Sequence, residues 1–500
     1  MRLPTLSLLS NNSQKRKGWT NEDMEPVPPH LRTWTTWVSA ALRVESSSSA
    51  ASQNYVAYWF SDAWTPATWE LASTMIAVGL SWKQALLLIL FGQIILAAVI
   101  LGSGTIGARL HIAFPVIARA SFGFWFSYVA IFCRILVSVF WFGVQTYIGS
   151  ECVHQMLKAL VGPAFLRIPN HLPPLCWDNH HGHALFCPLL AHRVTIPLRI
   201  PAQYSPPIRA IRVPPSTSLR YGSLRGTQAS TWGILRALNS AIGSWSPLAV
   251  NIPDFTRYAK NEKAQFVQIL VIPASITLVG VCGIIVASTS EVLYGEVIWD
   301  PLQLIDRWES RPASFFASLS FGLAVLGTNI AANSLSAAND MTVLWPSVIN
   351  IRRGQVLCGV LGAWILCPWK ILSSAPGFLT ILSSYSIFMA PIAAIMVVDY
   401  FIVRRCRVDV EQLYDPNGRY KYWHGTNWRA AAAFAIGFVP TLPGLIGRLN
   451  SSISVGDVGH VFDIGWIYAT VVTGFVYWTA SALFPPYASF VSEKVDKESE

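Results

Sequence analysis

Long apolar runs alternate with short polar segments along this chain from residue 54 to residue 484. A stretch of about 20 apolar residues is long enough to cross a bilayer as a helix. The pattern predicts an all-α polytopic membrane protein with about ten spans, at 55–80, 82–103, 124–150, 231–251, 264–289, 312–338, 355–375, 376–400, 429–448 and 463–484. The polar segments between the spans leave no room for a catalytic domain, so residues 54–484 are predicted to form one transmembrane domain.

Two of these runs are interrupted by proline, at Trp64-Thr65-Pro66 and at Trp245-Ser246-Pro247. Proline lacks an N–H and crowds the preceding turn, so each helix must kink or unwind there. In lipid, the freed backbone groups are tolerated only against protein or a water-lined cavity. Interrupted segments in both halves of a chain are typical of the binding site of a transporter, and this pairing predicts one here.

Composition and charge agree with a membrane protein. Hydrophobic residues make up 53% of the chain and charged residues 12%, about half of the ~25% usual in soluble domains. The net charge of +10 does not indicate nucleic-acid binding, because the basic residues lie in loops between spans. The basic loops alternate with loop 290–311, which is acidic on balance, and this predicts that both termini, residues 1–53 and 485–500, are cytoplasmic tails.

Two stretches do not follow this pattern. Residues 163–226 contain eleven of the 31 prolines and many arginines, with no apolar run able to span a bilayer. Residues 38–53 form a second atypical insert, in the predicted N-terminal tail. We interpret both as unspliced intron or shifted reading frame, a hypothesis that sequencing an intact transcript across them would refute.

Several long segments resemble the nucleobase–cation symporter-1 family, and within it the fungal uracil/allantoin/uridine permease branch. They include NYVAYWFSDAWTPATWELASTMIAVGLSWKQAL (54–86), RILVSVFWFGVQTYIG (134–149), NIPDFTRYAK (251–260) and TNIAANSLSAANDMTVLWPSVINIRRGQ (328–355). The resemblance implies a five-plus-five inverted repeat followed by two helices, with discontinuous helices one and six around a midplane site. The fourth and fifth of the twelve family helices have no counterpart here, because residues 163–226 stand in their place.

A nucleobase is a flat ring edged with donors and acceptors, so its recognition needs aromatic faces and carboxamides. Trp141 and Gln145 are four residues apart and share one helix face. The resemblance implies that Trp141, Gln145, Trp245 and Asn333 contact substrate, with Ser244 and Thr65 at neighbouring contact positions; the bacterial hydantoin transporter has Gln where this chain has Thr65. The alternative for these residues is ordinary packing or hydrogen bonding between helices.

For the coupling ion, the resemblance implies a site at the end of the first helix and on the eighth. The matching positions are the carbonyls of Ser61 and Trp64, with Ala324, Gly327 and Thr328. Gly327 stands where the sodium-coupled bacterial member has a serine hydroxyl, which favours a proton and leaves sodium as the alternative.

Three charged residues near the breaks complete the predicted site. Asp62 is the candidate proton carrier, because a membrane-embedded carboxylate is a functional hypothesis by default; its alternative is a static pair or an aqueous vestibule. Asp254 and Arg257 are candidate gate residues or an ordinary helix-end pair.

The predicted function is a secondary active permease that imports uracil, allantoin, uridine or a related heterocycle by proton symport at the plasma membrane. Its expected partners are the heterocycle, the coupling cation and the lipid bilayer, without nucleic acid, metal or cofactor. The cysteine and histidine residues at 176–192 fit no standard zinc spacing. Two alternatives remain open: a non-transporting remnant that lacks two helices, and a membrane-embedded enzyme.

Overall fold

The computed structural model describes residues 19–35, 55–162, 230–364, 372–450 and 452–491. In these ranges the secondary structure is helical, and β pairing is limited to two isolated bridges, Trp34–Ala259 and Trp423–Thr426. The Pro/Arg-rich stretch 163–226, the insert 38–53 and the cysteine–histidine segment 176–192 lie outside the described residues. The predicted domain boundaries therefore stay predictions.

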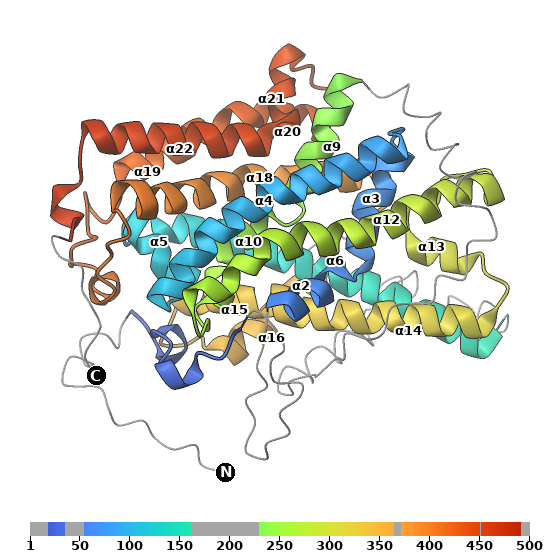
Figure 1. Cartoon of the computed structure of the whole chain (residues 1–500), viewed down its shortest axis with the longest axis horizontal. Coiled ribbons are helices and arrows are strands. Elements are labelled where there is room, and N and C mark those ends of the chain that lie inside the picture. Colours follow the sequence, from blue (N-terminus) through green and yellow to red (C-terminus); the bar gives the residue numbers. More distant parts are fainter. Residues whose placement is uncertain (1–18, 36–54, 163–229, 365–371, 451, 492–500) are drawn as a thin grey trace, which may run out of the picture.

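The long helices run side by side along the longest axis of the molecule (Figure 1). In the described ranges, six helical segments are long and apolar enough to cross a membrane: Trp82–Leu110 (α4), Ser127–Val161 (α6), Glu262–Tyr294 (containing α12, Gln268–Tyr294), Arg311–Leu344 (α14, Arg311–Thr328, and α15, Leu335–Leu344), Ala375–Val403 (containing α18, Ala375–Val398) and Trp428–Leu449 (α19, Trp428–Phe438, and α20, Leu442–Leu449). A seventh candidate joins Gly456–Asp463 to α22, Gly465–Leu483, through a bend of 83°. The predicted all-α polytopic fold is confirmed.

The two proline-interrupted runs are broken helices, as the sequence predicts. The first run forms α2 (Tyr55–Ala63) and α3 (Pro66–Ala77), which are separated at residues 64–65. The second forms α9 (Thr231–Gly243) and α10 (Ser246–Asn251), separated at residues 244–245. In both cases the proline lies in the first turn of the new helix, where its missing N–H costs no hydrogen bond.

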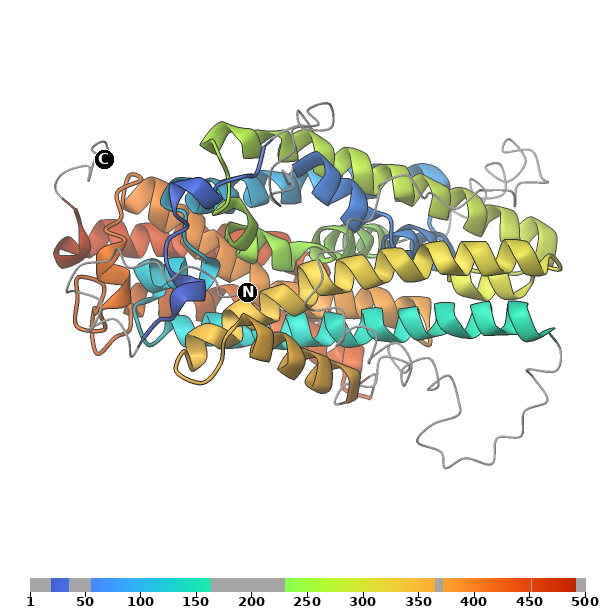
Figure 2. The ribbon, with the colours of Figure 1, turned by 90° about the horizontal axis from the view of Figure 1, so that it is seen from below.

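Three long helices, α12, α14 and α18, form the framework around these breaks together with the helices on which they pack. Helix α12 packs along α4 and α3, α14 packs along α6, and α18 packs along α22. Figure 2 shows α6 and α14 lying side by side over most of their length, and they run in opposite directions because the start of α14 contacts the end of α6. Because each helix satisfies its own backbone hydrogen bonds, apolar side chains can face either lipid or a neighbouring helix. The framework helices contact the broken helices from several sides, with α12 against α2 and α3 and α18 against α9 and α10.

The two ends of the helical bundle differ. At one end, residues 19–35 pack over the loops: Trp34 N–H donates to the Tyr258 carbonyl (3.0 Å), and the Tyr414 hydroxyl donates to the Met24 carbonyl (2.8 Å). Helix α5 (Phe114–Phe122) also lies at this end (Figure 1). The opposite end carries α13 (Pro301–Asp306) beside α3. The remaining helix of the core, α16 (Ile351–Trp364), packs on α15 and α6.

Candidate functional site

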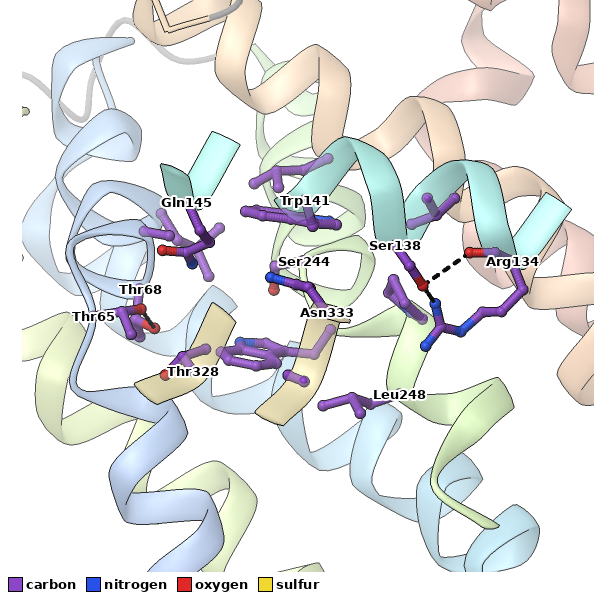
Figure 3. A pocket seen from close by; sticks show the side chains of 17 residues that line it. Thr65, Thr68, Arg134, Ser138, Trp141, Gln145, Ser244, Leu248, Thr328 and Asn333 are labelled. Carbon is purple, nitrogen blue, oxygen red and sulfur yellow. Dashed lines mark hydrogen bonds between the residues drawn. The ribbon is translucent and has the colours of Figure 1, made fainter. Parts of the chain in front are cut away.

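A small cavity of about 60 Å³ lies between the two helix breaks (Figure 3). That volume admits a few water molecules. Its walls come from the start of α3, the middle of α6, the break before α10, the end of α14 and the middle of α18. All six predicted substrate contacts line it: Thr65, Trp141, Gln145, Ser244, Trp245 and Asn333. The structure thus brings together side chains that are up to 268 positions apart in the sequence.

Helix α6 presents Trp141 and Gln145 on one face, as their spacing predicts. The Trp141 ring meets the Tyr385 ring edge to face, with centroids 6.1 Å apart and planes at 76°. The Gln145 side chain is only 4% exposed, and its Oε1 has no hydrogen-bond partner. A buried carbonyl oxygen without a partner is costly, so this acceptor is available to a donor that enters the cavity.

Asn333 lies on a π-helical turn, Asn329–Ser334, between α14 and α15. Its Nδ2 donates to Asn329 Oδ1 (2.9 Å), and Asn329 Nδ2 donates in turn to the Phe142 carbonyl (3.1 Å) and to Thr146 Oγ1 (3.2 Å). Single π-helical turns inside α-helices are frequent at functional sites. Asn329 therefore ties the turn to α6 and positions the Asn333 carboxamide at the cavity.

The second break contributes Ser244 and Trp245. The Ser244 carbonyl accepts a hydrogen bond from the Tyr385 hydroxyl (3.1 Å), while its own hydroxyl donates to the Ala241 carbonyl (2.8 Å). The Trp245 ring meets the Trp59 ring of α2 edge to face, with centroids 6.0 Å apart. Tyr385 on α18 therefore stabilises the unwound backbone, and the Trp245 indole contacts the other broken helix.

The first break contributes two threonines. Thr65 and Thr68 line the cavity with hydroxyl oxygens 3.3 Å apart, and Thr65 is 1% exposed. Thr68 was not among the predicted contacts. Its signal was its position one turn after Thr65, on the same face of the helix that begins at Pro66.

The predicted coupling residues lie where α2 ends and where α14 ends. Asp62 is buried, and its Oδ2 has no hydrogen-bond partner. The Thr328 side chain lies beside the Asp62 carboxyl, without a hydrogen bond of normal geometry, and it also lines the cavity. Ser61 is exposed, whereas Trp64, Ala324 and Gly327 are half-buried. Over the part of the chain that the structure describes, no three His, Cys, Asp or Glu side chains are grouped to hold a metal ion.

The two predicted gate residues are both buried at the end that carries residues 19–35, and they have separate partners. Asp254 Oδ1 accepts from the Phe114 N–H at the start of α5 (2.9 Å). The Arg257 guanidinium donates to the Asp23 carbonyl (3.1 Å) and lies 4.9 Å from the centre of the Tyr258 ring. These contacts join the second broken helix to α5 and to the N-terminal segment.

Four further residues with a clear place at the site were absent from the predicted set. Tyr385 and Asn329 fix the break and the π-helical turn, as described above. Arg134 lines the cavity, hydrogen-bonds Ser138 and lies within Coulombic reach of Asp340, whose carboxylate oxygens are buried without partners. Charged residues inside apolar runs are rare and functional by default, so Arg134 and Asp340 could have been found from the sequence.

Known proteins match this chain over most of its length. The family model for permeases for cytosine/purines, uracil, thiamine and allantoin matches residues 44–196 and 217–468. The uridine permease of Saccharomyces cerevisiae is 32% identical over 499 residues, which are 93% of this chain and 75% of that protein. The allantoin permease of the same yeast is 31% identical over 526 residues, covering 97% and 79% of the two chains.

The fold has a counterpart among solved structures. Mhp1, a nucleobase-cation-symport-1 family transporter in a closed conformation with bromovinylhydantoin bound, superposes with a TM-score of 0.62. The sequence identity is 21%, and the match covers 96% of this chain and 97% of that one. The chain therefore belongs to the nucleobase–cation symporter-1 family, and it is a membrane permease rather than an enzyme.

Proposed function

We propose that this permease imports a uracil-, allantoin- or uridine-like heterocycle across the plasma membrane together with a proton. The observation that carries the proposal is the cavity between the helix breaks, which gathers two indoles, two carboxamides and five hydroxyls. The relatives named as permeases for uridine and allantoin support the same class of substrate.

Recognition would combine stacking with hydrogen bonding at the ring edge. Trp141 and Trp245 supply aromatic faces, and stacking a base on such a face contributes about 1–3 kcal/mol. Gln145 Oε1 is a buried acceptor without a partner, so an imide N–H of the ring would satisfy it. Asn333 adds a second carboxamide from the opposite wall. A ring that lacks a matching donor would leave Gln145 unsatisfied and would be rejected.

Coupling would use Asp62 at the end of α2. Its carboxyl faces Thr328 on α14, so a change of charge on Asp62 acts between a broken helix and the framework. Gly327 offers no hydroxyl next to Thr328, which favours a proton over a sodium ion that needs a full set of oxygen ligands. Alternating access would then move the broken helices against the framework of α6 and α14.

The gate would lie at the end that carries residues 19–35. Asp254 and Arg257 join the second broken helix to α5 and to the N-terminal segment, and opening toward that side would require those hydrogen bonds to separate. We infer that this end faces the cytoplasm, in line with the cytoplasmic N-terminal tail that the charge pattern of the loops predicts.

Uptake of radiolabelled uracil, allantoin and uridine, in cells that lack their own permeases, tests the proposal. We expect uptake of at least one substrate to rise when the external pH falls from about 7 to about 5, because protons are then more available to a carboxyl. Protein present at the plasma membrane that takes up none of the three would contradict the assignment and favour a non-transporting remnant.

The variant Gln145→Ala tests the role of the carboxamide. We expect the KM for the transported substrate to rise about tenfold, because one hydrogen bond to the ring contributes about 1–1.5 kcal/mol. Thermal stability should not fall, since the substitution removes a buried acceptor that has no partner in the empty site. Gln412→Ala, in the short 3-10 helix Glu411–Tyr414 outside the cavity, is the control. An unchanged KM for Gln145→Ala would remove Gln145 from the site.

A further inference from the structure

A second cavity, of about 430 Å³, lies beside α3 at the end of the molecule opposite residues 19–35. Its lining differs from that of the substrate cavity because four carboxyl side chains face it. They are Glu70 on α3, Glu151 on α6, and Asp300 and Asp306 at the two ends of α13. We call this space the acidic cavity.

Glu70 is the most deeply buried of the four. Its side chain is 2% exposed, and its Oε2 has no hydrogen-bond partner although it faces the acidic cavity. A buried carboxylate without a partner is unfavourable by several kcal/mol unless a proton or a cation neutralises it. Among the described residues, the charged form of this acid is therefore left without a hydrogen-bond partner at Oε2.

The nearest charged groups further destabilise the ionised form of Glu70. Glu151 and Asp300 lie within Coulombic reach of Glu70, and both have the same sign. Burial raises the pKa of the Asp300 carboxyl, and hydrogen bonds from Leu302 and Gln303 offset only part of that effect. Two or three carboxyls that share one site hold a proton between them, because they cannot all ionise.

Two basic residues at the rim form ion pairs with acids other than Glu70, Glu151 and Asp300. Lys158 pairs with Asp306 (2.5 Å), and Arg307 pairs with Glu296 (2.7 Å). Burial alone would raise the pKa of the Asp306 carboxyl, but Lys158 and Gln155 hydrogen-bond it and lower the pKa below its usual value. Asp306 is thus an ionised rim residue, in contrast with the inner group of Glu70, Glu151 and Asp300.

The charged and titratable side chains that line this cavity with Glu70 come from α6 and from the α13 segment. They are Tyr147, Glu151, His154, Asp300, Asp306 and Arg307. In the described part of the chain, α12 and α18 pack on α3 without contributing to the lining. Among the residues that the structure describes, these carboxyls are not grouped as metal ligands.

The acidic cavity shares two walls with the substrate cavity. On α3, Thr68 and Leu71 line the substrate cavity and Glu70 lines the acidic one. On α6, Gln145 lines the first and Tyr147 the second. A change of charge at Glu70 therefore acts on the same broken helix that holds the substrate.

We propose that Glu70, Glu151 and Asp300 form an outward-facing proton-loading site, distinct from Asp62 and joined to the substrate cavity through α3 and α6. A proton from the outer solution adds to a carboxylate oxygen of this group and gives a neutral carboxylic acid. Release of the same proton restores the carboxylate, so no other reactant is needed. The proposal rests on the proposed proton symport, and it adds a second acid to that mechanism.

Infrared spectroscopy of the full-length protein in lipid nanodiscs tests the site without any transport. We expect a carboxylic-acid C=O stretching band near neutral pH that is lost in Glu70→Gln. The matched control is Glu309→Gln, an exposed acid between α13 and α14 that does not line the acidic cavity. A band that is equally strong in Glu70→Gln and in the unmodified protein would overturn the proposal.

The pH dependence of uptake gives a second readout. In Glu70→Gln we expect the stimulation between about pH 7 and about pH 5 to disappear, because this side chain can no longer take up a proton. In Asp300→Asn the midpoint should move to lower pH, because Glu70 loses a negative neighbour that favours its protonated form. Profiles that match the unmodified protein in both variants would overturn the proposal.

The two readouts separate this proposal from the proposed function. If the unmodified protein shows the Glu70-dependent band but no acid-stimulated uptake, the loading site stands and proton symport fails. If uptake is acid-stimulated while band and profile are unaffected by Glu70→Gln, symport stands and the loading site fails. The Asp300→Asn variant keeps both readouts usable if Glu70→Gln does not fold.

Discussion

The two broken helices have the same local pattern, a tryptophan two residues before a proline, but they place different groups at the break. At the first break, Asp62 is buried with a carboxylate oxygen that lacks a partner. At the second, Ser244 and Trp245 present a carbonyl held by Tyr385 and an indole that faces the cavity. In the proposed function, one backbone arrangement would therefore serve two purposes: the first break would carry an ionisable group, and the second a recognition surface.

Contacts between the two breaks explain how such different groups can act together. The indole of Trp59, on α2, meets the indole of Trp245 with centroids 6.0 Å apart. Trp59 Nε1 also donates to Gln268 Oε1 on α12 (2.8 Å), so its ring orientation is fixed by the framework. In the proposed mechanism, a movement of α2 that follows a change of charge on Asp62 would thereby be transmitted to the Trp245 ring. Three substitutions test this division of roles.

The largest effect is expected at the first break. Asp62→Asn keeps the shape of the side chain but removes its ability to release a proton, so uptake should fall more than about tenfold and lose its pH dependence. Binding of substrate to purified protein should change by less than about threefold, since the rings and carboxamides remain. Ser61→Ala is the control, because only the Ser61 carbonyl is predicted to matter. Equal losses of binding and uptake in Asp62→Asn would assign Asp62 to recognition instead.

The second largest effect is expected at the second break. Trp245→Ala removes an aromatic face, and the loss of about 1–3 kcal/mol of stacking should raise the substrate Kd roughly 5- to 150-fold. Equilibrium binding measures this Kd directly. The Kd of Trp245→Phe is expected to lie between those of Trp245→Ala and the unmodified protein. Trp478→Ala, whose side chain is 47% exposed on α22, serves as the matched tryptophan control. A Kd for Trp245→Ala within twofold of the unmodified protein would show that this indole serves packing alone.

The smallest effect concerns the hydroxyl that holds the second break. Tyr385→Phe removes the hydrogen bond to the Ser244 carbonyl while it keeps the ring beside Trp141. One such bond contributes about 1 kcal/mol, so we expect a Kd about fivefold higher. Tyr294→Phe, at the far end of α12, controls for loss of a tyrosine hydroxyl. An unaffected Kd would mean that the unwound backbone keeps its position without support from α18.

The pattern of the chain was enough to predict the elements and the family. Membrane spans are visible in the sequence because each must bury about 20 apolar residues in lipid. The breaks are visible because Pro66 and Pro247 interrupt such runs, where a continuous helix is excluded for steric reasons. The six cavity residues were predicted through the resemblance. The residue type of Trp141 or Asn333 alone does not distinguish a substrate contact from an ordinary packing residue.

Which side chains meet was decided by the tertiary structure. Tyr385 lies 141 positions from Ser244, and Asp300 lies 230 positions from Glu70, so no local pattern connects either pair. Whether Asp254 and Arg257 bind each other or other partners also depends on α5 and residues 19–35, which approach from distant parts of the chain. The sequence by itself determined which segments form helices and where the two proline-interrupted runs break, because those features follow from burial and backbone hydrogen bonding within one segment. Helix packing alone decided which polar atoms are left without partners, and it is those atoms, on Asp62, Glu70 and Gln145, that distinguish the proposed proton and substrate sites.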